Sequence, residues 1–231
     1  MFYTCIKCGS VYGEKINWCS VCYTDKSLVA RPEPGLKTYF VRGERRGVVS
    51  LSDIRNREVK GRSVRGFEKL GLFPELWKGL IYGIAGSMKS RFCLRFSQAY
   101  FDTVLYVSAE EGFGDTMKTK LVLDEIISPH IFFSDAQQKW EMLEDIEKVA
   151  PGLLVIDSIS ATQEDCIDTS LDLAQLWVCH SNKDKTFKGD SSIGHCVDLV
   201  MRIEDGIITV EKNRFGLSNI QFSLDGKEIG L

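Results

Sequence analysis

The sequence lacks any long hydrophobic run and any strong excess of charge of one sign. No apolar run approaches the ~20 residues that a membrane-spanning helix needs, and the N-terminus lacks the charged-then-apolar pattern of a signal peptide. We therefore expect a cytoplasmic protein with no membrane partner. A formal net charge of −3 gives no overall nucleic-acid signature, so any contact with DNA or RNA must come from local patches. With 231 residues, the chain is long enough for one substantial core and a small module.

The cysteines fall into two groups. Four of them near the N-terminus form two C-x2-C pairs separated by ten residues, namely Cys5, Cys8, Cys19 and Cys22. This spacing is typical of a tetrahedral Zn²⁺ site, because each pair presents two thiolates to the same metal. Disulfides or unpaired core thiols are the alternative, which the missing secretion signal disfavours. The other four are scattered and are predicted to be small buried hydrophobic residues: Cys93, Cys166, Cys179 and Cys196.

These patterns predict three parts of the chain: a zinc module at 1–28, a linker at 29–44 and an α/β domain at 45–231. So short a module cannot build much core, so the metal would supply its folding energy. Two prolines and a glycine within 31–35 fit neither helix nor strand. The stretch 41–66 is the most basic of the sequence, with seven arginines and Lys60. It is either a solvated face or a contact surface for phosphates or a neighbouring subunit, and the sequence leaves both open.

The segment Gly83–Ser90 (GIAGSMKS) lies between an apolar strand and an apolar helix, the order that a phosphate-binding loop requires. The consensus G-x-x-x-x-G-K-[ST] is matched at Gly83, Lys89 and Ser90, whereas Met88 stands in place of its last glycine. In such a loop the backbone N–H groups surround the phosphates, the lysine meets the β- and γ-phosphates, and the serine holds Mg²⁺. The segment alone is equally compatible with an ordinary glycine-containing turn. The predicted nucleotide-binding residues are Gly83, Gly86, Ser87, Met88, Lys89, Ser90 and Arg91.

The remaining sequence alternates between strand-like and helix-like patterns. Apolar runs of strand length alternate with helical periods, which indicates a mostly parallel sheet flanked by helices. The expected strands are 103–108, 131–133, 153–157 and 176–179, followed by 197–203 and 207–211 as a hairpin that turns at Gly206. The expected helices after the phosphate loop are 115–127 and 136–149. Glu110 and Asp157 follow strands, so we expect them to join the phosphate loop at the carboxyl edge of the sheet.

Taken together and in order, these motifs resemble the bacterial RadA (Sms) family, RecA-superfamily ATPases of DNA repair. The resemblance runs from about Tyr3 to Leu224 and is carried by the four-cysteine module, GIAGSMKS, LYVSAEEG, LLVIDSIS, IGHCVDLVMRI and the pentapeptide KNRFG. KNRFG is the motif that distinguishes the family. The resemblance implies a RecA-like P-loop NTPase core with an N-terminal zinc ribbon. It also implies two cofactors, a structural Zn²⁺ and the Mg²⁺ that accompanies ATP.

The resemblance also implies roles for individual residues. Lys89 would bind phosphate, Glu110 would polarise the attacking water, and Asp157 would hold Mg²⁺ together with Ser90. His180 and Ser181 would sense the γ-phosphate. The pentapeptide would couple ATP at a subunit interface to DNA; its residues are Lys212, Asn213, Arg214, Phe215 and Gly216. The implied function is a DNA-dependent ATPase of homologous recombination or repair, in branch migration or strand-exchange processing.

The implied partners are single-stranded or branched DNA, further copies of the chain up to a hexameric ring, and a helicase or recombinase. Three features depart from the family. Met88 replaces a glycine, only about eighteen residues separate Asp157 from Leu176, and the chain stops soon after Gly216. We therefore expect a short form without the family's C-terminal Lon-protease-like domain. The departures keep an alternative open, a nucleotide-binding adaptor with weak or no hydrolysis that recruits a helicase or recombinase to DNA.

Overall fold

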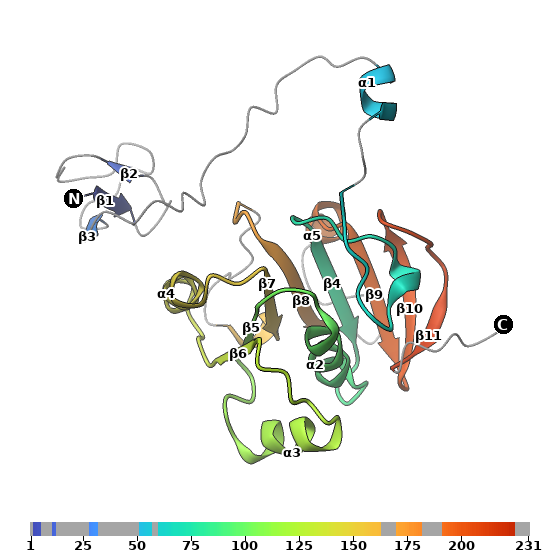
Figure 1. Cartoon of the computed structure of the whole chain (residues 1–231). Helices are drawn as coiled ribbons and strands as arrows, with labels where there is room; N and C mark the ends of the chain where they lie inside the picture. Colours follow the sequence, from blue (N-terminus) through green and yellow to red (C-terminus); the bar gives the residue numbers. More distant parts are fainter. Residues whose placement is uncertain are drawn as a thin grey trace. The chain divides into compact units, whose positions relative to one another are not determined.

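A computed structural model of the chain describes residues 2–5, 11–12, 28–31, 51–56, 60–162, 170–181 and 191–224 (Figure 1). The chain divides into two compact units, Met1–Ser50 and Leu51–Leu231. The first unit contains an antiparallel sheet of order β2-β1-β3, with β1 at Phe2–Cys5, β2 at Val11–Tyr12 and β3 at Leu28–Arg31. Strand β3 occupies the first residues of the predicted linker, and the rest of that linker lies outside the described residues.

The second unit holds an eight-stranded sheet with helices along the chain between its strands. Its strands are β4 (Lys78–Gly83), β5 (Val104–Ser108), β6 (Ile131–Ser134), β7 (Leu153–Asp157), β8 (Ala174–His180), β9 (Leu199–Glu204), β10 (Ile207–Asn213) and β11 (Gln221–Ser223). Its helices are α1 (Leu51–Asn56), η1 (Glu68–Leu70), α2 (Lys89–Ala99), α3 (Asp115–Leu123), α4 (Lys139–Val149), η2 (Ile159–Ala161) and α5 (Ser191–Cys196).

The strand order is β11-β10-β9-β4-β8-β7-β5-β6, in which the six strands from β9 to β6 run parallel and β10 pairs antiparallel with both β9 and β11. The expectation of a mostly parallel sheet flanked by helices is confirmed. Strand β4 lies inside the sheet, and the chain crosses from it over β8 and β7 to reach β5. This order gathers the carboxyl ends of β4, β5, β7 and β8 along one edge.

Local sequence signals account for several element ends. The predicted hairpin joins β9 to β10 through Asp205 and Gly206, whose φ angles are 50° and 77°. Two positive φ values in a two-residue loop are the geometry that Asp-Gly favours, because it matches the twist of the strands. Helix α4 begins with a capping box between Gln138 and Glu141 and ends at Ala150 in the left-handed region.

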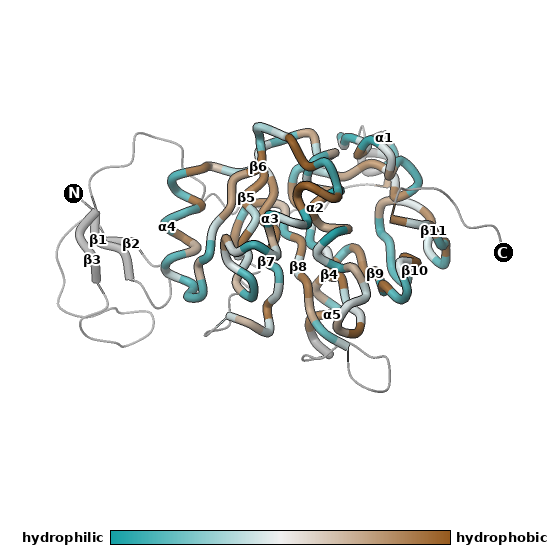
Figure 2. Tube along the Cα trace, turned by 90° about the horizontal axis from the view of Figure 1, so that it is seen from below, coloured by the Kyte–Doolittle hydropathy of each residue, from teal (hydrophilic) through white to brown (hydrophobic). Residues whose placement is uncertain are grey.

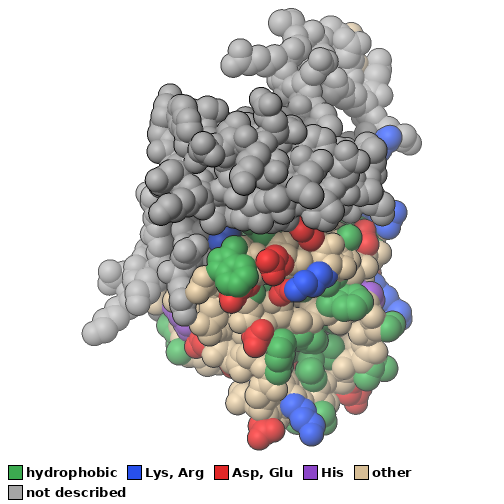
Figure 3. Space-filling model, turned by 90° about the vertical axis from the view of Figure 1, so that its left-hand side faces the viewer, with side chains coloured by type: hydrophobic (Ala, Val, Ile, Leu, Met, Phe, Trp, Pro, Cys, Tyr) green, Lys and Arg blue, Asp and Glu red, His purple; other side chains and the backbone are tan. Residues whose placement is uncertain are grey.

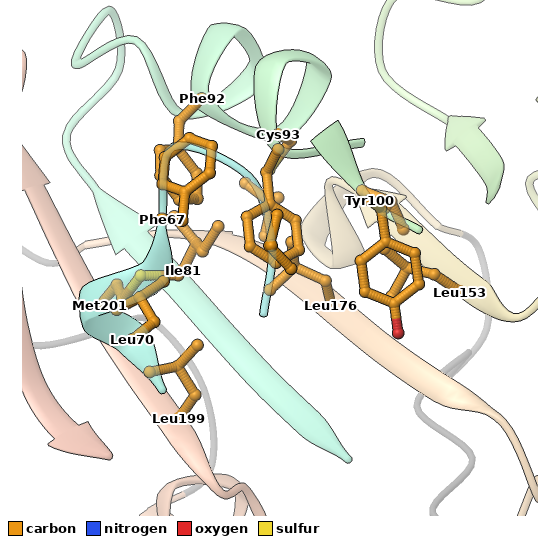
Figure 4. Packing of buried hydrophobic residues seen from close by; sticks show 14 of the residues in the cluster. Phe67, Leu70, Ile81, Phe92, Cys93, Tyr100, Leu153, Leu176, Leu199 and Met201 are labelled. Atoms are coloured by element: carbon orange, nitrogen blue, oxygen red, sulfur yellow. The ribbon is translucent and has the colours of Figure 1, made fainter. Parts of the chain in front are cut away.

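Two hydrophobic layers hold the sheet. On one face, aromatic residues of α2 and of the segment before β4 pack on the strands, as Figure 4 shows around Phe67, Phe92 and Ile81. On the other face, Met142 of α4 and Val197 pack on the alternate residues of the same strands. Strands β5 and β7 are buried along their whole length, as expected for parallel strands covered on both faces. Figure 2 shows the hydrophobic colour concentrated along the strands.

Several smaller predictions can be compared with this fold. Cys93 and Cys179 are buried, as predicted, but Cys196 is exposed, so that prediction was wrong. Cys196 is the last residue of α5, and its neighbour Val197 takes the buried position instead. Cys166 lies outside the described residues. The described part of the short connection between β7 and β8 contains only the 3-10 turn η2. No helix among the described residues is long and apolar enough to cross a membrane.

Candidate active site

The loop Gly83–Ser90, predicted to bind phosphate and called the phosphate loop below, connects β4 to α2. A Cβ on Gly83 would lie 2.2 Å from the carbonyl oxygen of Ile203 and 2.6 Å from Ser87 Oγ, so only glycine fits there. Gly86 has a φ of 79°. Met88 has φ 73° and ψ 23°, the left-handed conformation that glycine adopts easily, and its side chain is 40% exposed. A non-glycine residue in this region costs about 1–2 kcal/mol. Met88 therefore adopts the backbone conformation that the consensus glycine would adopt, and it is strained there.

Lys89 points its ammonium group into this loop. Its Nζ donates hydrogen bonds to the carbonyl oxygens of Gly83, at 3.0 Å, and Ile84, at 2.8 Å, and the residue is 7% exposed. Burial lowers the pKa of Lys89, while the nearby charge of Asp157 opposes that shift. The lysine thus has a desolvated ammonium beside the loop, where a phosphate would replace the two carbonyl partners.

Asp157 ends β7 and lies next to the loop. Its Oδ2 accepts a hydrogen bond of 2.6 Å from the hydroxyl of Tyr106, and the residue is 8% exposed. Burial raises the pKa of Asp157, while hydrogen bonds from Tyr106 and Ser90 oppose the rise. The Ser90 hydroxyl thus lies near the Asp157 carboxylate, as two oxygen ligands of one Mg²⁺ would need to be. Tyr106 was not among the predicted site residues, although a tyrosine within a buried strand needs a partner for its hydroxyl.

Glu110 follows β5 and meets the ends of two other strands. Its Oε2 lies 3.4 Å from the hydroxyl of Ser158, after β7, and 3.5 Å from Nε2 of His180, the last residue of β8. The Glu110 side chain is 53% exposed, so one carboxylate oxygen faces this edge while solvent reaches the group. The neighbouring Glu111 forms an ion pair of 2.5 Å with Lys120. The edge of the sheet therefore brings together Glu110 and His180 near the strand end that carries Asp157.

Arg91, predicted to bind nucleotide, has a protein partner in this structure. Its guanidinium donates two hydrogen bonds of 2.7 Å to Asp124, which also accepts one from Arg95. Burial alone would raise the pKa of Asp124, but the hydrogen bonds from both arginines outweigh it and hold that pKa below its ordinary value. These contacts tie α2 to the end of α3. In this structure Arg91 supports the position of α2 behind the phosphate loop.

The pentapeptide Lys212–Gly216 lies at the other edge of the sheet. Asn213 is opposite Leu199 in the hairpin, and Leu199 is opposite Gly79 near the start of β4, whereas the phosphate loop follows the end of β4. Within one chain the two motifs are therefore not brought together. Lys212 Nζ donates to the carbonyl oxygen of Gly194 at 2.9 Å, and Arg214 forms a 2.9 Å ion pair with Asp198.

The other three pentapeptide residues support the fold. The Asn213 amide donates to the carbonyl oxygens of Leu70, at 3.1 Å, and Leu217, at 3.0 Å, and its oxygen accepts from the Phe215 amide at 2.9 Å. The ring of Phe215 lies 5.3 Å from that of Phe73. A Cβ on Gly216 would lie 2.9 Å from the Leu70 carbonyl oxygen, so the two backbones are in close contact there.

No family model matches the chain. It is 27% identical over 247 residues to the DNA repair protein RadA of Aquifex aeolicus, which covers 93% of this chain and 55% of that protein. RadA of Halalkalibacterium halodurans is 28% identical over 183 residues, and the match covers 66% of this chain and 39% of that protein. RadA of Chlamydia trachomatis is 25% identical over 261 residues, and the match covers 94% of this chain and 55% of that protein.

The chain is similar in sequence to these RadA proteins. It spans about half the length of the curated relatives that it matches. Among solved structures, the flagellar accessory protein FlaH of Methanocaldococcus jannaschii is 14% identical with a TM-score of 0.48, over 68% of this chain and 89% of that chain. The expected resemblance to the RadA family is confirmed by these three relatives, and the α/β fold with a mostly parallel sheet is confirmed by the strand order.

The predicted zinc ligands are not tested by this structure. Cys5 is the last residue of β1, but its side chain lies outside the described residues, as do Cys8, Cys19 and Cys22 entirely. Among the described residues, no three or more His, Cys, Asp or Glu side chains form a cluster suited to a metal ion. The Zn²⁺ site remains a prediction from cysteine spacing.

Proposed function

We propose that this RadA-like chain binds Mg-ATP at the carboxyl edge of its sheet and hydrolyses it as a DNA-dependent ATPase of recombination or repair. The observation that carries the proposal is the cluster of three groups at the ends of β4 and β7. The Lys89 ammonium lies inside the loop, and the Ser90 hydroxyl lies near the buried Asp157 carboxylate. The same register of residue types serves phosphoryl transfer in P-loop NTPases.

The chain's own residues suggest how the site would work. Backbone N–H groups of the loop would surround the phosphates, and Lys89 would exchange its two carbonyl partners for phosphate oxygens. Ser90 and Asp157 would hold Mg²⁺, which when bound supplies positive charge against the charge on the transferred phosphoryl group. Glu110 would orient the attacking water from the exposed side of the edge. Ser87 Oγ is buried without a partner among the described residues, so it is available to a phosphate oxygen.

The pentapeptide adds a reason to propose an oligomer. It lies at the opposite edge of the sheet from the phosphate loop of its own chain. If Lys212 and Arg214 act at an ATP site, that site belongs to a neighbouring copy, so we propose a homo-oligomer with shared sites, up to the hexameric ring that the resemblance implies. The relatives are named DNA repair proteins, which supports DNA as the partner. On the face shown in Figure 3, the described acidic and basic side chains are interspersed, so this face does not suggest a DNA surface.

The test is phosphate release by the purified full chain from Mg-ATP, with and without single-stranded DNA. We expect Lys89→Ala to lower turnover by about 100-fold or more, because it removes a charge placed on the transferred phosphoryl group. Lys118→Ala is the matched control, since Lys118 is an exposed lysine of α3 outside the cluster. Phosphate release no greater than that of Lys89→Ala would contradict the proposal.

The same measurement separates the ATPase from the adaptor. An adaptor would bind ATP tightly with negligible turnover, and it is motivated by Met88 and by the short connection between Asp157 and Leu176. The left-handed backbone at Met88 gives the loop the path that glycine would give it, which supports turnover. Robust DNA-stimulated phosphate release would exclude the adaptor.

We also propose that the four N-terminal cysteines bind one Zn²⁺ ion and that this module meets a DNA or protein partner. Metal analysis of the purified chain should give one zinc per chain, and Cys8→Ser together with Cys22→Ser should remove it. An unchanged zinc content in the double variant would show that the metal is held elsewhere.

A further inference from the structure

Met88 is the exposed methionine of the described chain. Its side chain is 40% exposed, whereas Met117, Met142 and Met201 are 3%, 2% and 0% exposed. Thioether oxidation follows exposure, because the oxidant must reach the sulfur. Among these four residues, an oxidant in solution should therefore modify Met88 first.

The position of Met88 makes such a modification consequential. Met88 directly precedes Lys89 and provides the N-cap of α2, where a phosphate would bind to the loop. Its sulfur lies 3.7 Å from the point that a Cβ on Gly206 would occupy, so the side chain reaches from the loop to the β9–β10 turn. A bulkier or more polar group on this sulfur would thus act on the loop and on the turn together.

Oxidation changes both the shape and the charge distribution of the side chain. It converts a flexible apolar thioether into a polar sulfoxide, whose oxygen carries partial negative charge. That oxygen would be attached to a residue of the loop that gathers N–H groups and the Lys89 ammonium for an anion. It would repel phosphate oxygens and could accept hydrogen bonds from the same donors.

We propose that Met88 is a methionine-oxidation site, and that its sulfoxide weakens nucleotide binding at the phosphate loop. The inference rests on the proposed function, since it concerns the same loop. In the reaction with hydrogen peroxide, a lone pair of the Met88 sulfur attacks one peroxide oxygen and the O–O bond breaks. A proton transfers to the departing oxygen and water leaves, so that sulfur is oxidised by two electrons and the peroxide is reduced by two.

The experiment compares the full-length chain and Met88→Leu before and after hydrogen peroxide, followed by dithiothreitol to reverse cysteine disulfides. Peptide mass spectrometry follows the gain of about 16 Da per sulfoxide at each methionine. Binding of a fluorescent ATP analogue is measured on the same samples. We expect Met88 to be oxidised about tenfold faster than the three buried methionines, and the analogue's affinity to fall by about tenfold. Methionine sulfoxide reductase should restore it.

Met88→Leu has the same cysteines and the same buried methionines, so peroxide should leave its own starting affinity unmoved. Equal losses of affinity in both proteins would overturn the inference, as would equal oxidation of all four methionines. Unaltered binding by a chain that is fully oxidised at Met88 would overturn it while leaving the proposed function intact. An untreated chain that does not bind the analogue would overturn both.

Discussion

The phosphate loop and the pentapeptide Lys212–Gly216 lie at opposite edges of one sheet and differ in how fully their groups are used. In the loop, Met88 is strained and Ser87 Oγ is buried without a partner among the described residues. In the pentapeptide, the Asn213 side chain uses both its amide and its oxygen, and Phe215 packs on other aromatic rings. Backbone strain and a buried hydroxyl without a partner indicate a ligand-binding site. Side chains whose polar groups all have partners indicate a structural contact that stabilises the fold.

The largest expected effect on stability comes from Gly71, whose backbone contacts the pentapeptide at Phe215. A Cβ on Gly71 would lie 2.1 Å from the carbonyl oxygen of Phe215, and Gly71 has a φ of 92°. We expect Gly71→Ala to lower the free energy of unfolding by more than about 3 kcal/mol, since two backbones would have to separate. Urea unfolding would measure it.

Gly66→Ala is the matched control for this change. Gly66 has a φ of 81°, but nothing lies within 4 Å of a Cβ built on it. Its substitution should therefore cost only the left-handed strain, about 1 kcal/mol. Equal losses of unfolding free energy in the Gly71 and Gly66 variants would mean that the backbone at Gly71 is not closely packed against Phe215. The pentapeptide would then not be the closely packed structural contact that distinguishes it from the phosphate loop.

The next effect separates two neighbouring residues of the pentapeptide. We expect Asn213→Ala to cost about 2 kcal/mol, because it leaves the Leu70 carbonyl oxygen and the Phe215 amide without their partner. Arg214→Ala should cost less than about 0.5 kcal/mol, because its ion pair with Asp198 is exposed. If the pentapeptide also serves a neighbouring ATP site, Arg214→Ala should lower DNA-stimulated turnover far more than it lowers stability. If the loss of turnover in each variant is no larger than its loss of stability explains, the pentapeptide has only a structural role.

The sequence predicts the parts of the site that depend on order along the chain. Gly83, Lys89 and Ser90 lie within one eight-residue segment, and Asp157 ends an apolar strand, so motif and periodicity are sufficient for them. The partners that depend on strand order escape such reasoning. Tyr106 reaches Asp157 only because β5 lies beside β7, and Arg91 finds Asp124 thirty-three residues away. Residue spacing alone contains neither fact, which is why the edge occupied by the pentapeptide was also unforeseen.

The pH dependence of stability tests whether the Asp157 carboxylate beside the phosphate loop is desolvated. Burial raises its pKa in the folded chain, so the folded state binds a proton more tightly than the unfolded state. Stability should therefore fall as pH rises from the ordinary aspartate pKa through the raised one, by about 1.4 kcal/mol for each unit of the rise. Asp157→Asn removes this charge and should be more stable than the native chain at neutral pH, with a difference that shrinks in acid. Urea unfolding at several pH values would measure it. A difference that is constant with pH would mean that Asp157 is not desolvated, and the variant should in either case lose turnover.

The smallest expected effect is the release of strain at Met88. Met88→Gly should gain about 1 kcal/mol from the relaxed left-handed backbone and lose part of it to the greater freedom of the unfolded chain. Ala150→Gly is the matched control, because Ala150 has a φ of 49° at the end of α4, away from the loop. Both variants should shift the urea midpoint by a similar small amount. Only Met88→Gly should change nucleotide affinity or turnover, because only its strain lies where the phosphate binds. A change of affinity in both variants would assign the effect to general stability and would remove the special role of strain at the loop.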